Sequence, residues 1–495
     1  MNNPIPLNSD TLPNLSEHVR IPAYDREKVR AGIVHIGVGG FHRAHQALYV
    51  DNYLAKALSE KAEAEWGICG VGLLKYDQKM QSVLQKQDCL YTLVERSPEQ
   101  DSARVIGSIV EYLYAPDNPQ AVIDKLASAE CKIVTLTITE GGYYVIEGTG
   151  GFDKDHPTIQ HDLKNPEQPK GVCGFLAAAL RRRQAQGLPP FTLLSCDNIQ
   201  GNGDTARRML LSFAELQDPD LAKWLSLEGA FPNSMVDRIT PSTTPADIEM
   251  VSEQFGIQDE WPVVAEPFLQ WVIEDKFCAG RPSFESVGVQ MTDDVHPYEM
   301  MKLRLLNASH SLLGYAGSLL GYTYSSEAME DKLVRRAIER MMDEASSTLP
   351  PLPGIQLSDY KQTLIERFSN PKVQDQLSRL CLNGSDKMPK FVLGSVRDKL
   401  DKGESVTHLS LAIALWFRYL NGQDEQGNPL PLDDSMAEIL RERALAGKDD
   451  PTPLLGIEAI FGDLAGAPTF VDTLSKHLQQ LYALGTKEKL ARLLS

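Results

Sequence analysis

The sequence predicts an α/β fold: a doubly wound N-terminal domain built on a parallel sheet, followed by a mostly α-helical C-terminal domain. Short apolar segments rich in β-branched residues alternate with helix-like stretches in the first part, whereas longer amphipathic patterns dominate from residue 292 on. The chain of 495 residues also exceeds what one hydrophobic core fills. We therefore expect two domains, residues 1–291 and residues 292–495.

The sheet of the first domain is expected to begin in AGIVHIGVGG, residues 31–40, where a buried strand runs into a glycine turn. Strands that alternate with helices are typical of a parallel sheet, because each helix returns the chain to the same end of the sheet. Further strands are expected at Trp66–Leu73, Cys131–Thr139 and Phe191–Ser195, with helices at Ala121–Ala129 and Phe175–Gln186.

The second domain has helical periodicity and few strand candidates. Pro-rich and polar turns such as Leu349–Gly354 and Asn421–Asn428 separate its elements. Helices are expected at Met300–Tyr322, Glu327–Glu344 and Leu409–Leu420.

Composition and charge exclude several classes of function. A formal net charge of -18 works against binding to nucleic acid or to anionic membranes. The first residues, MNNPIPLNSD, do not resemble a secretory signal, and no apolar run reaches the length of about 18 residues that a membrane span needs. The seven cysteines are scattered without a CxxC pair, so we expect reduced thiols, no metal site and a cytoplasmic location.

The glycine turn is the first candidate site. Gly37, Val38, Gly39, Gly40 and Phe41 lie where a strand hands over to a helix, and glycine lets the backbone approach the pyrophosphate of a dinucleotide. The pattern departs from GxGxxG, because a histidine holds the third position. An ordinary strand–turn–helix would also fit these residues.

An acidic residue after the second strand commonly binds the adenosine ribose, and Asp77 follows Trp66–Leu73 closely enough to do so. This would favour NAD over NADP. Its distance from Gly37 exceeds the usual spacing of about 20 residues, so the intervening segment must be long. Asp77 could instead be a solvated loop residue, and the nearby Lys75 could weaken discrimination against a 2′-phosphate.

The segment KLRLLNASH places Lys302, Asn307 and His310 in an apolar run expected to be helical. At about 100° per residue they lie near 0°, 140° and 80°, on one broad face. Oxidation of a secondary alcohol requires a base for the hydroxyl proton, and a desolvated lysine such as Lys302 can serve. The amide of Asn307 could stabilise the developing alkoxide, and His310 could orient a hydroxyl. Each of the three could also be purely structural.

Two further segments add polar groups to the first domain. Asp197 and Asn198 follow the Phe191–Ser195 strand, and the carboxyl end of a parallel strand is where such sheets bind ligands. Asn198 could be a second alkoxide donor or a helix or turn cap. FPNSMVDRITP contributes Asp237 and Arg238.

Taken together, several motifs resemble the mannitol dehydrogenase family of polyol-specific long-chain dehydrogenases. The resemblance covers nearly the whole chain and rests on GVGGFHRAHQ, TITEGGY, SCDN, MVDRITP, EPFLQWVIEDKF, KLRLLNASH and IERFSNP. It implies a Rossmann-type N-terminal domain that binds NAD, a largely helical C-terminal domain, an active site between them, no zinc and a monomeric enzyme. His35, His42 and His45 are then assigned to the cofactor turn and its packing.

The resemblance also implies roles for individual residues. Lys302 matches the general base, and Asn198 and Asn307 match the oxyanion pocket. Glu140 and Glu299 match acidic residues near the site, the latter on a proton path to water. The residues that match contacts to substrate hydroxyl groups are Asp237, His310, Arg379 and Lys387.

The substrate is expected to be a neutral polyol or ketose. Relatives that reduce fructuronate or tagaturonate have TEKGY where this chain has TEGGY, and a lysine there would suit an anionic uronate, so Gly141 favours D-mannitol and D-fructose. D-Arabinitol with D-xylulose, D-sorbitol as a side substrate, and the uronates are also possible within the family. A nonenzymatic NAD-binding sensor is a function of another class, but it would not need Lys302, Asn307 and Asn198.

Overall fold

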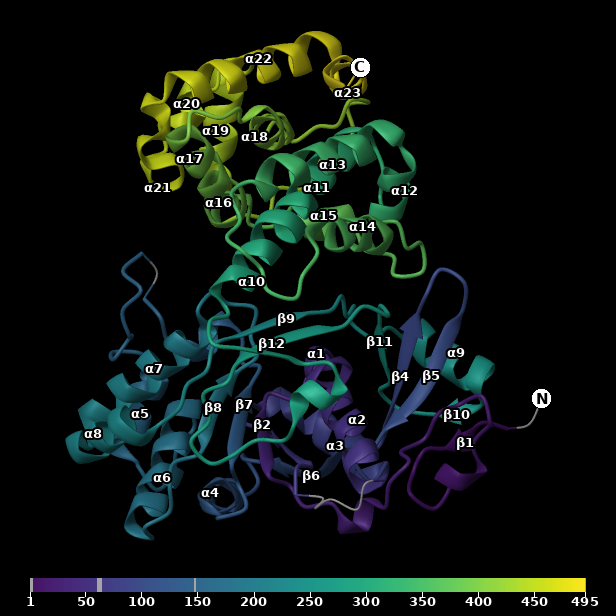
Figure 1. The fold of residues 1–495 in the computed structure, drawn as a ribbon, viewed down its shortest axis with the longest axis vertical. Helices are drawn as coiled ribbons and strands as arrows, with labels where there is room; N and C mark the ends of the chain where they lie inside the picture. The colour runs from purple at the N-terminus through teal and green to yellow at the C-terminus, as the bar shows by residue number, and fades with distance from the viewer. Residues whose placement is uncertain (1–2, 60–64, 147, 495) are drawn as a thin grey trace. The chain divides into compact units, whose positions relative to one another are not determined.

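The computed structural model describes residues 3–59, 65–146 and 148–494. The chain divides into two compact units, which meet in the sequence at Val295 and His296 (Figure 1). This boundary lies close to residue 292, where the sequence changes from strand-and-helix alternation to long helical patterns.

The central sheet of the first unit has five parallel strands in the order β6-β3-β2-β7-β8. Counted along the chain, this order is 3-2-1-4-5, which is the doubly wound arrangement of a Rossmann-type fold and confirms the predicted fold class. The winding changes direction at the first of these strands, so a ligand crevice is expected at its carboxyl end. The strands are β2 (Ile33–Ile36), β3 (Ile68–Gly72), β6 (Ile109–Tyr114), β7 (Ile133–Leu136) and β8 (Thr192–Ser195).

Two apolar cores cover the two faces of this sheet. Alternate residues of one strand enter different cores: Val34 and Ile36 belong to one, whereas Ile33 belongs to the other. The first core also takes in residues of α4 (Pro119–Ala127), α6 (Val172–Ala185), α7 (Asn202–Gln217) and α8 (Pro219–Glu228). The second takes in residues of α1 (Gly40–Ala44), α2 (Gln46–Ser59) and α3 (Gln78–Lys86). Burial on both faces explains why β2, β3, β7 and β8 have almost entirely apolar sequences.

Eight further strands of the described residues lie outside the central sheet and were not predicted, nor was β6. They form three small sheets whose orders are β11-β4-β5, β13-β12-β9 and β1-β10. Several are only two or three residues long, which is too short to give a period-two pattern. They are β1 (Ile5–Pro6), β4 (Tyr91–Arg96), β5 (Asp101–Ile106), β9 (Ser234–Asp237), β10 (Ile257–Gln258), β11 (Val263–Ala265), β12 (Gln270–Glu274) and β13 (Gln290–Thr292). The remaining helices of this unit are α5 (Pro157–Lys164) and α9 (Pro245–Phe255).

The second unit is helical, as predicted, and its buried helix α18 packs against α11 and α22. The expected single helix at Met300–Tyr322 is wrong in one respect, because a π-helical segment, η6 (Lys302–Asn307), interrupts it. A second π-helical segment is η7 (Pro389–Leu393). The α-helices are α10 (His296–Met301), α11 (Ala308–Leu319), α12 (Ser325–Glu330), α13 (Lys332–Ser346), α14 (Leu357–Phe368), α15 (Leu377–Leu380), α16 (Gly384–Met388), α17 (Gly394–Asp401), α18 (Thr407–Tyr419), α19 (Ala437–Gly447), α20 (Thr452–Leu455), α21 (Glu458–Phe461), α22 (Pro468–Leu484) and α23 (Thr486–Leu494).

Two further expectations concern the whole chain. All seven cysteines are free, and five of them are buried. Among the helices of the described residues, none combines the length and the apolar character needed to cross a bilayer.

Candidate active site

The glycine turn lies at the carboxyl end of β2, at the point where the winding of the sheet changes direction. Gly37 has a φ of +96°, and a Cβ there would lie 2.2 Å from the carbonyl oxygen of Thr137. A Cβ at Gly39 would meet nothing closer than 3.9 Å, and one at Gly40 nothing closer than 3.8 Å. The turn therefore requires glycine at position 37. At positions 39 and 40 a Cβ would make only ordinary contacts, with the carbonyl oxygen of Gly37 and with the side chains of Thr240 and Val263 respectively.

Val38 and Phe41, the other two predicted residues of the turn, hold it in place by packing. Val38 is buried, and its side chain packs so closely on β3 that a Cβ at Gly70 would lie 2.8 Å from it. Phe41 stacks on His45 with ring centroids 5.0 Å apart. His45 in turn is tied through Nε2 to the carbonyl oxygen of Gln270 at 2.8 Å. These contacts assign Val38, Phe41 and His45 to the packing of the turn.

Two stacked histidines replace the contact that a third glycine makes in GxGxxG. The rings of His35 and His42 lie 3.4 Å apart and almost parallel, at 12°. His35 also has hydrogen bonds to the hydroxyl groups of Thr135 and Thr137, at 2.7 and 3.0 Å. Burial lowers the pKa of His35 to about 3 and lowers the pKa of His42 well below its ordinary value. Both rings are therefore neutral near pH 7, and their flat contact keeps α1 close to β2.

Asp77 folds back onto the carboxyl end of β3. Its carboxylate accepts a hydrogen bond from the backbone N–H of Leu74 at 2.8 Å, and a Cβ at Gly72 would lie 2.6 Å from the Cβ of Asp77. The residue is half-buried, and desolvation raises the pKa of its carboxyl group. The long separation from Gly37 is taken up by α1 and α2. Lys75 is exposed beside it.

Asp197 links the loops that follow β7 and β8. Its carboxylate accepts hydrogen bonds from the backbone N–H groups of Ile138 and Thr139, at 3.0 and 2.8 Å, and from the hydroxyl group of Tyr143 at 2.6 Å. Thr139 has a φ of +60°, a conformation that is costly for a β-branched residue and persists only where such contacts hold it.

Two predicted site residues, Glu140 and Asn198, are exposed and directly follow the two residues that this contact joins, Thr139 and Asp197. The sequence shows Asp197 as a polar residue after a strand, but it does not show that its carboxylate holds the backbone of another loop. The available signal is a carboxylate placed directly after a buried strand, where it can reach the backbone N–H groups of a neighbouring loop.

Asp237 is the last residue of β9 and is buried. The next residue, Arg238, is buried in the same unit. Gly141 lies in the segment that follows β7, and a Cβ there would meet nothing within 4 Å. Crowding at the Cβ position therefore does not explain why this chain has glycine there.

In the second unit, Lys302 and Asn307 mark the two ends of η6. A regular α-helix would place them about 140° apart, and this expectation is wrong. A π-helix pairs backbone groups five residues apart, so residues i and i+5 lie nearly above one another, and these two side chains leave the same side of the segment. Lys302 is 7% exposed. Oδ1 of Asn307 is buried without a hydrogen-bond partner among the described residues, so this oxygen is open to a donor such as a hydroxyl group.

The flanking helices carry two more predicted residues. On α11, the ring of His310 packs against Phe368, with centroids 4.7 Å apart. On α10, the buried Glu299 lies three residues before Lys302, and a carboxylate oxygen of Glu299 is 3.9 Å from Nδ1 of the exposed His296. Glu299 is thus placed between a buried lysine and a histidine in contact with solvent.

Arg379 and Lys387 lie on adjacent short helices, α15 and α16. Arg379 makes a two-fold ion pair with Asp375, with distances of 2.7 and 2.6 Å, and it lines a cavity of about 380 Å³. Lys387 donates a hydrogen bond to the carbonyl oxygen of Leu380 at 3.1 Å. Burial, together with the charge of Arg379, lowers the pKa of Lys387. The cavity wall also includes Ser378, Cys381, Leu382, Tyr419, Pro431 and Asp433.

Within the described ranges, 3–59, 65–146 and 148–494, no group of three or more His, Cys, Asp or Glu side chains is arranged to hold a metal ion.

Comparison with known proteins gives the same division of the chain. Residues 31–286 match the family model of the mannitol dehydrogenase Rossmann domain, and residues 294–482 match that of the mannitol dehydrogenase C-terminal domain. Mannitol 2-dehydrogenase of Phaeosphaeria nodorum is 48% identical over 491 residues, which cover 98% of this chain and 85% of that protein. Mannitol 2-dehydrogenase of Aspergillus fumigatus is 50% identical over 471 residues, covering 93% of each chain.

Two solved structures are similar over nearly their whole length. One is the Pseudomonas fluorescens mannitol 2-dehydrogenase in a ternary complex with NAD and D-mannitol, with 45% identity, a TM-score of 0.84 and 99% coverage of both chains. The other is a D-sorbitol dehydrogenase in substrate-free form, with 36% identity and a TM-score of 0.91, covering 98% of this chain and all of that one.

Proposed function

We propose that this chain, which belongs to the mannitol dehydrogenase family and is an NAD-dependent polyol dehydrogenase, interconverts D-mannitol and D-fructose at C2. The observation that carries the proposal is the pair formed by the buried Lys302 and by Asn307, which leave one side of a π-helical segment five residues apart. The solved relative that is 45% identical holds NAD and D-mannitol. The proposal includes a monomeric, cytoplasmic enzyme that works without zinc.

The residues of the first unit fit a dinucleotide. The pyrophosphate would lie against the backbone N–H groups of Gly39 and Gly40, because the N–H groups at the start of a helix favour an anion. Asp77 would accept hydrogen bonds from the adenosine ribose, and its negative charge would disfavour the 2′-phosphate of NADP. When bound, NAD supplies the acceptor for the hydride that leaves C2.

Lys302 is the proposed general base. In its neutral form, the amine accepts the proton of the C2 hydroxyl group through Nζ, and the lysine is buried at 7% exposure. Asn307 and Asn198 donate side-chain N–H groups to the oxygen as negative charge develops on it. An amide donor suits this role because its charge does not change during the reaction.

The remaining residues orient the substrate and release the proton. His310, Asp237, Arg379 and Lys387 are proposed to contact hydroxyl groups away from C2. Glu299 is proposed to pass the proton from Lys302 toward solvent, and its contact with the exposed His296 supports this direction of travel. Glu140, on the loop held by Asp197, is proposed to lie near the reacting end of the substrate.

D-Sorbitol is the second candidate substrate, because a relative that is 36% identical is a D-sorbitol dehydrogenase. D-Mannitol and D-sorbitol differ in configuration at C2 and both give D-fructose when oxidised there, so reduction of D-fructose alone does not separate them. D-Arabinitol and the uronates are further candidate substrates within the family. Gly141 supports a neutral substrate, because this chain has no lysine at the position where the uronate-reducing relatives have one.

The deciding experiment measures NADH formation from D-mannitol, D-sorbitol and D-arabinitol at matched concentrations, and NADH consumption with D-fructose and D-fructuronate. NADP and NADPH serve as cofactor controls. We expect the highest kcat/KM with D-mannitol and NAD, and mannitol as the product from D-fructose. A preference for D-sorbitol or D-fructuronate would overturn the substrate assignment. NADH binding without turnover of any of these would favour a nonenzymatic NAD-binding sensor.

A further inference from the structure

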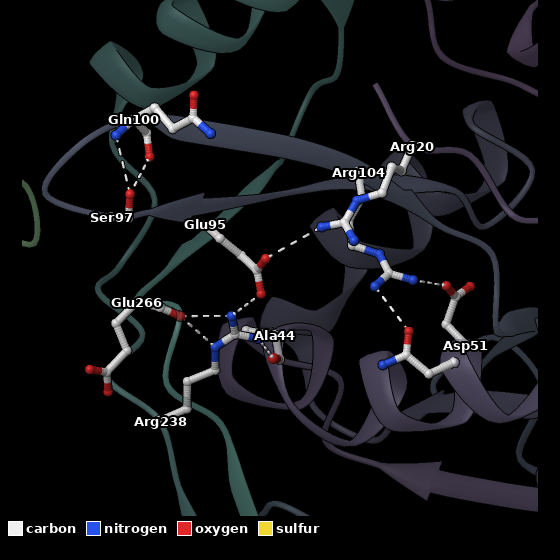
Figure 2. Close-up of polar contacts among 10 residues, drawn as sticks. Arg20, Ala44, Asp51, Glu95, Ser97, Gln100, Arg104, Arg238 and Glu266 are labelled. Carbon is white, nitrogen blue, oxygen red and sulfur yellow. Dashed lines mark hydrogen bonds and ion pairs between the residues drawn. The ribbon is translucent and has the colours of Figure 1, made fainter. Parts of the chain in front are cut away.

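Arg238 is a buried arginine that follows Asp237 directly at the end of β9. Its side chain is 0% exposed. The guanidinium group donates to the carbonyl oxygen of Ala44 at 2.5 Å, to the carbonyl oxygen of Glu266 at 2.9 and 2.7 Å, and to the carboxylate of Glu95 at 2.6 Å (Figure 2). Three chain segments that are distant in sequence therefore meet at this one side chain.

One of those segments is the helix that starts in the glycine turn. Ala44 is the last residue of α1, and Gly40 is its first. A five-residue helix is too short to hold its own conformation, so its orientation depends on contacts to the carbonyl groups left unpaired at its end. The hydroxyl group of Tyr91 holds the carbonyl oxygen of Arg43 at 2.7 Å, and Arg238 holds that of Ala44.

The segment that follows β9 also contacts the other end of this helix. A Cβ at Gly40 would lie 3.8 Å from the side chain of Thr240, two residues after Arg238. Residues 238–240 thus contact α1 at its last carbonyl group and at its first residue. A shift of Arg238 would move the backbone N–H groups of Gly39 and Gly40, which the proposed function assigns to the pyrophosphate.

We propose that Arg238 is a positioning residue for the dinucleotide: it fixes α1, and with it the glycine turn, to the strand that carries Asp237. This inference rests on the assignment of the glycine turn to NAD, and it adds a physical connection between the cofactor turn and the strand of a proposed substrate contact. Arg238 itself is not expected to touch the cofactor or the substrate.

The molecule offers a matched control in Arg104 of β5. It is also a largely buried arginine, with its side chain 15% exposed, and it pairs with the carboxylate of Asp51 at 2.5 Å (Figure 2). It also donates a hydrogen bond to the amide oxygen of Asn52 at 3.0 Å. Both of those acceptors are side chains of α2 rather than carbonyl groups of α1. Replacing either arginine by lysine keeps a positive charge, but a compact ammonium group cannot reach several acceptors at once.

The test compares Arg238→Lys with Arg104→Lys in the full-length chain, measuring the Kd of NADH by fluorescence titration and Tm without ligand. Both variants should lower Tm. Only Arg238→Lys should weaken NADH binding, by about tenfold, as expected when well-aligned hydrogen bonds that fix the site are lost. Its kcat at saturating NADH should stay within about threefold of the wild type, because the reacting groups are unchanged.

Equal Kd values for the two variants, with only Tm lowered, would overturn the positioning role. If Arg238→Lys does not fold, Glu95→Gln takes its place, since it keeps the hydrogen bond but removes the charge that holds the guanidinium. It should raise the Kd of NADH by about threefold, and an unchanged Kd would count against the inference. A wild type that binds NADH but oxidises no polyol would refute the proposed function and leave this comparison valid, whereas a wild type that binds no NADH would refute both.

Discussion

The glycine turn of the first unit and the π-helical segment η6 of the second unit both carry proposed site residues, but they differ in how sequence determines them. The turn needs a residue with positive φ at Gly37, so one residue type reveals the conformation. The sequence of η6, KLRLLN, consists of residues that any α-helix would accept. Its conformation is held by contacts with the rest of the unit. A local rule therefore finds the first site, whereas the second depends on tertiary structure.

The largest expected effect separates chemistry from binding in these two regions. Lys302→Ala removes the proposed base, and kcat for D-mannitol should fall by about 10³-fold, within the usual range for a general base. The Kd of NADH should stay unchanged, because the turn is intact. A control is Lys489→Ala, which removes another buried lysine of the same unit, paired with Gln480, and should lower Tm but spare kcat. Wild-type turnover by Lys302→Ala would contradict the mechanism.

The next effect tests the turn itself with two glycines. Gly37→Ala places a Cβ 2.2 Å from a backbone oxygen at a φ of +96°, so it should raise the Kd of NADH by about 100-fold and lower Tm by several degrees. Gly39→Ala meets no atom closer than 3.9 Å and should leave Tm unchanged. The methyl group would enter the space assigned to the pyrophosphate, however, so Kd should rise by about tenfold. If Gly39→Ala left binding intact, the phosphate would not lie there.

The same contrast explains how much of the fold could be predicted from the sequence. Four of the five parallel strands are buried on both faces, and these four stood out as short apolar runs between helical patterns. The strand β6 did not, because the side chains of Val110, Glu111, Tyr112 and Leu113 are only partly buried and mix polar with apolar character. Two- and three-residue strands such as β10 and β11 owe their existence to pairing partners far away in the sequence.

For the site, sequence reasoning was most informative where a residue type is required by backbone geometry. It identified Gly37, and it identified Lys302 and Asn307 as polar residues in an apolar run. It could not detect that these two lie on the same side of their segment, because the change from α- to π-helical hydrogen bonding leaves no mark in the residues themselves. Nor could it separate Asp197, which holds backbone N–H groups, from the adjacent Asn198.

A smaller effect should follow from loosening η6 without touching the proposed base. Arg304 lies inside the segment, and its guanidinium group donates to the carbonyl oxygen of Thr348 at 3.0 Å and to the carboxylate of Asp398 at 2.5 Å. Arg304→Gln cannot keep both contacts, so Lys302 should be less well placed, and kcat should fall by about tenfold with the Kd of NADH unchanged.

The control for this prediction is Arg335→Gln, which breaks an exposed pair with Glu339 on α13. It should change kcat by less than about twofold, because exposed ion pairs contribute little. Equal kcat values for the Arg304 and Arg335 variants would mean that η6 keeps its conformation without the anchor to Asp398.

The smallest expected effect is the pH dependence of stability, and it arises from the histidines packed under the glycine turn. His35 has a folded-state pKa of about 3, below the value of about 6.5 expected in the unfolded chain. Between these values the unfolded chain binds a proton that the folded chain does not, so the free energy of unfolding rises with pH across this window. The contribution is complete above about pH 6.5 and is lost as pH falls toward 3, at up to about 1.4 kcal/mol per pH unit for each such group.

His42 shares this environment, since burial lowers its pKa in the same direction and its ring stacks on His35. His42→Phe keeps an aromatic ring in the stack but removes one titrating group, whereas His477 of the second unit, also with a pKa of about 3, is the same in both proteins and cancels in the comparison. Denaturant unfolding at pH 7 and pH 5 should therefore show a smaller loss of stability in His42→Phe than in the wild type, by up to about 2 kcal/mol. Equal losses would mean that His42 accepts a proton within the folded turn, and the turn would then be more tolerant of acid than its buried histidine pair predicts.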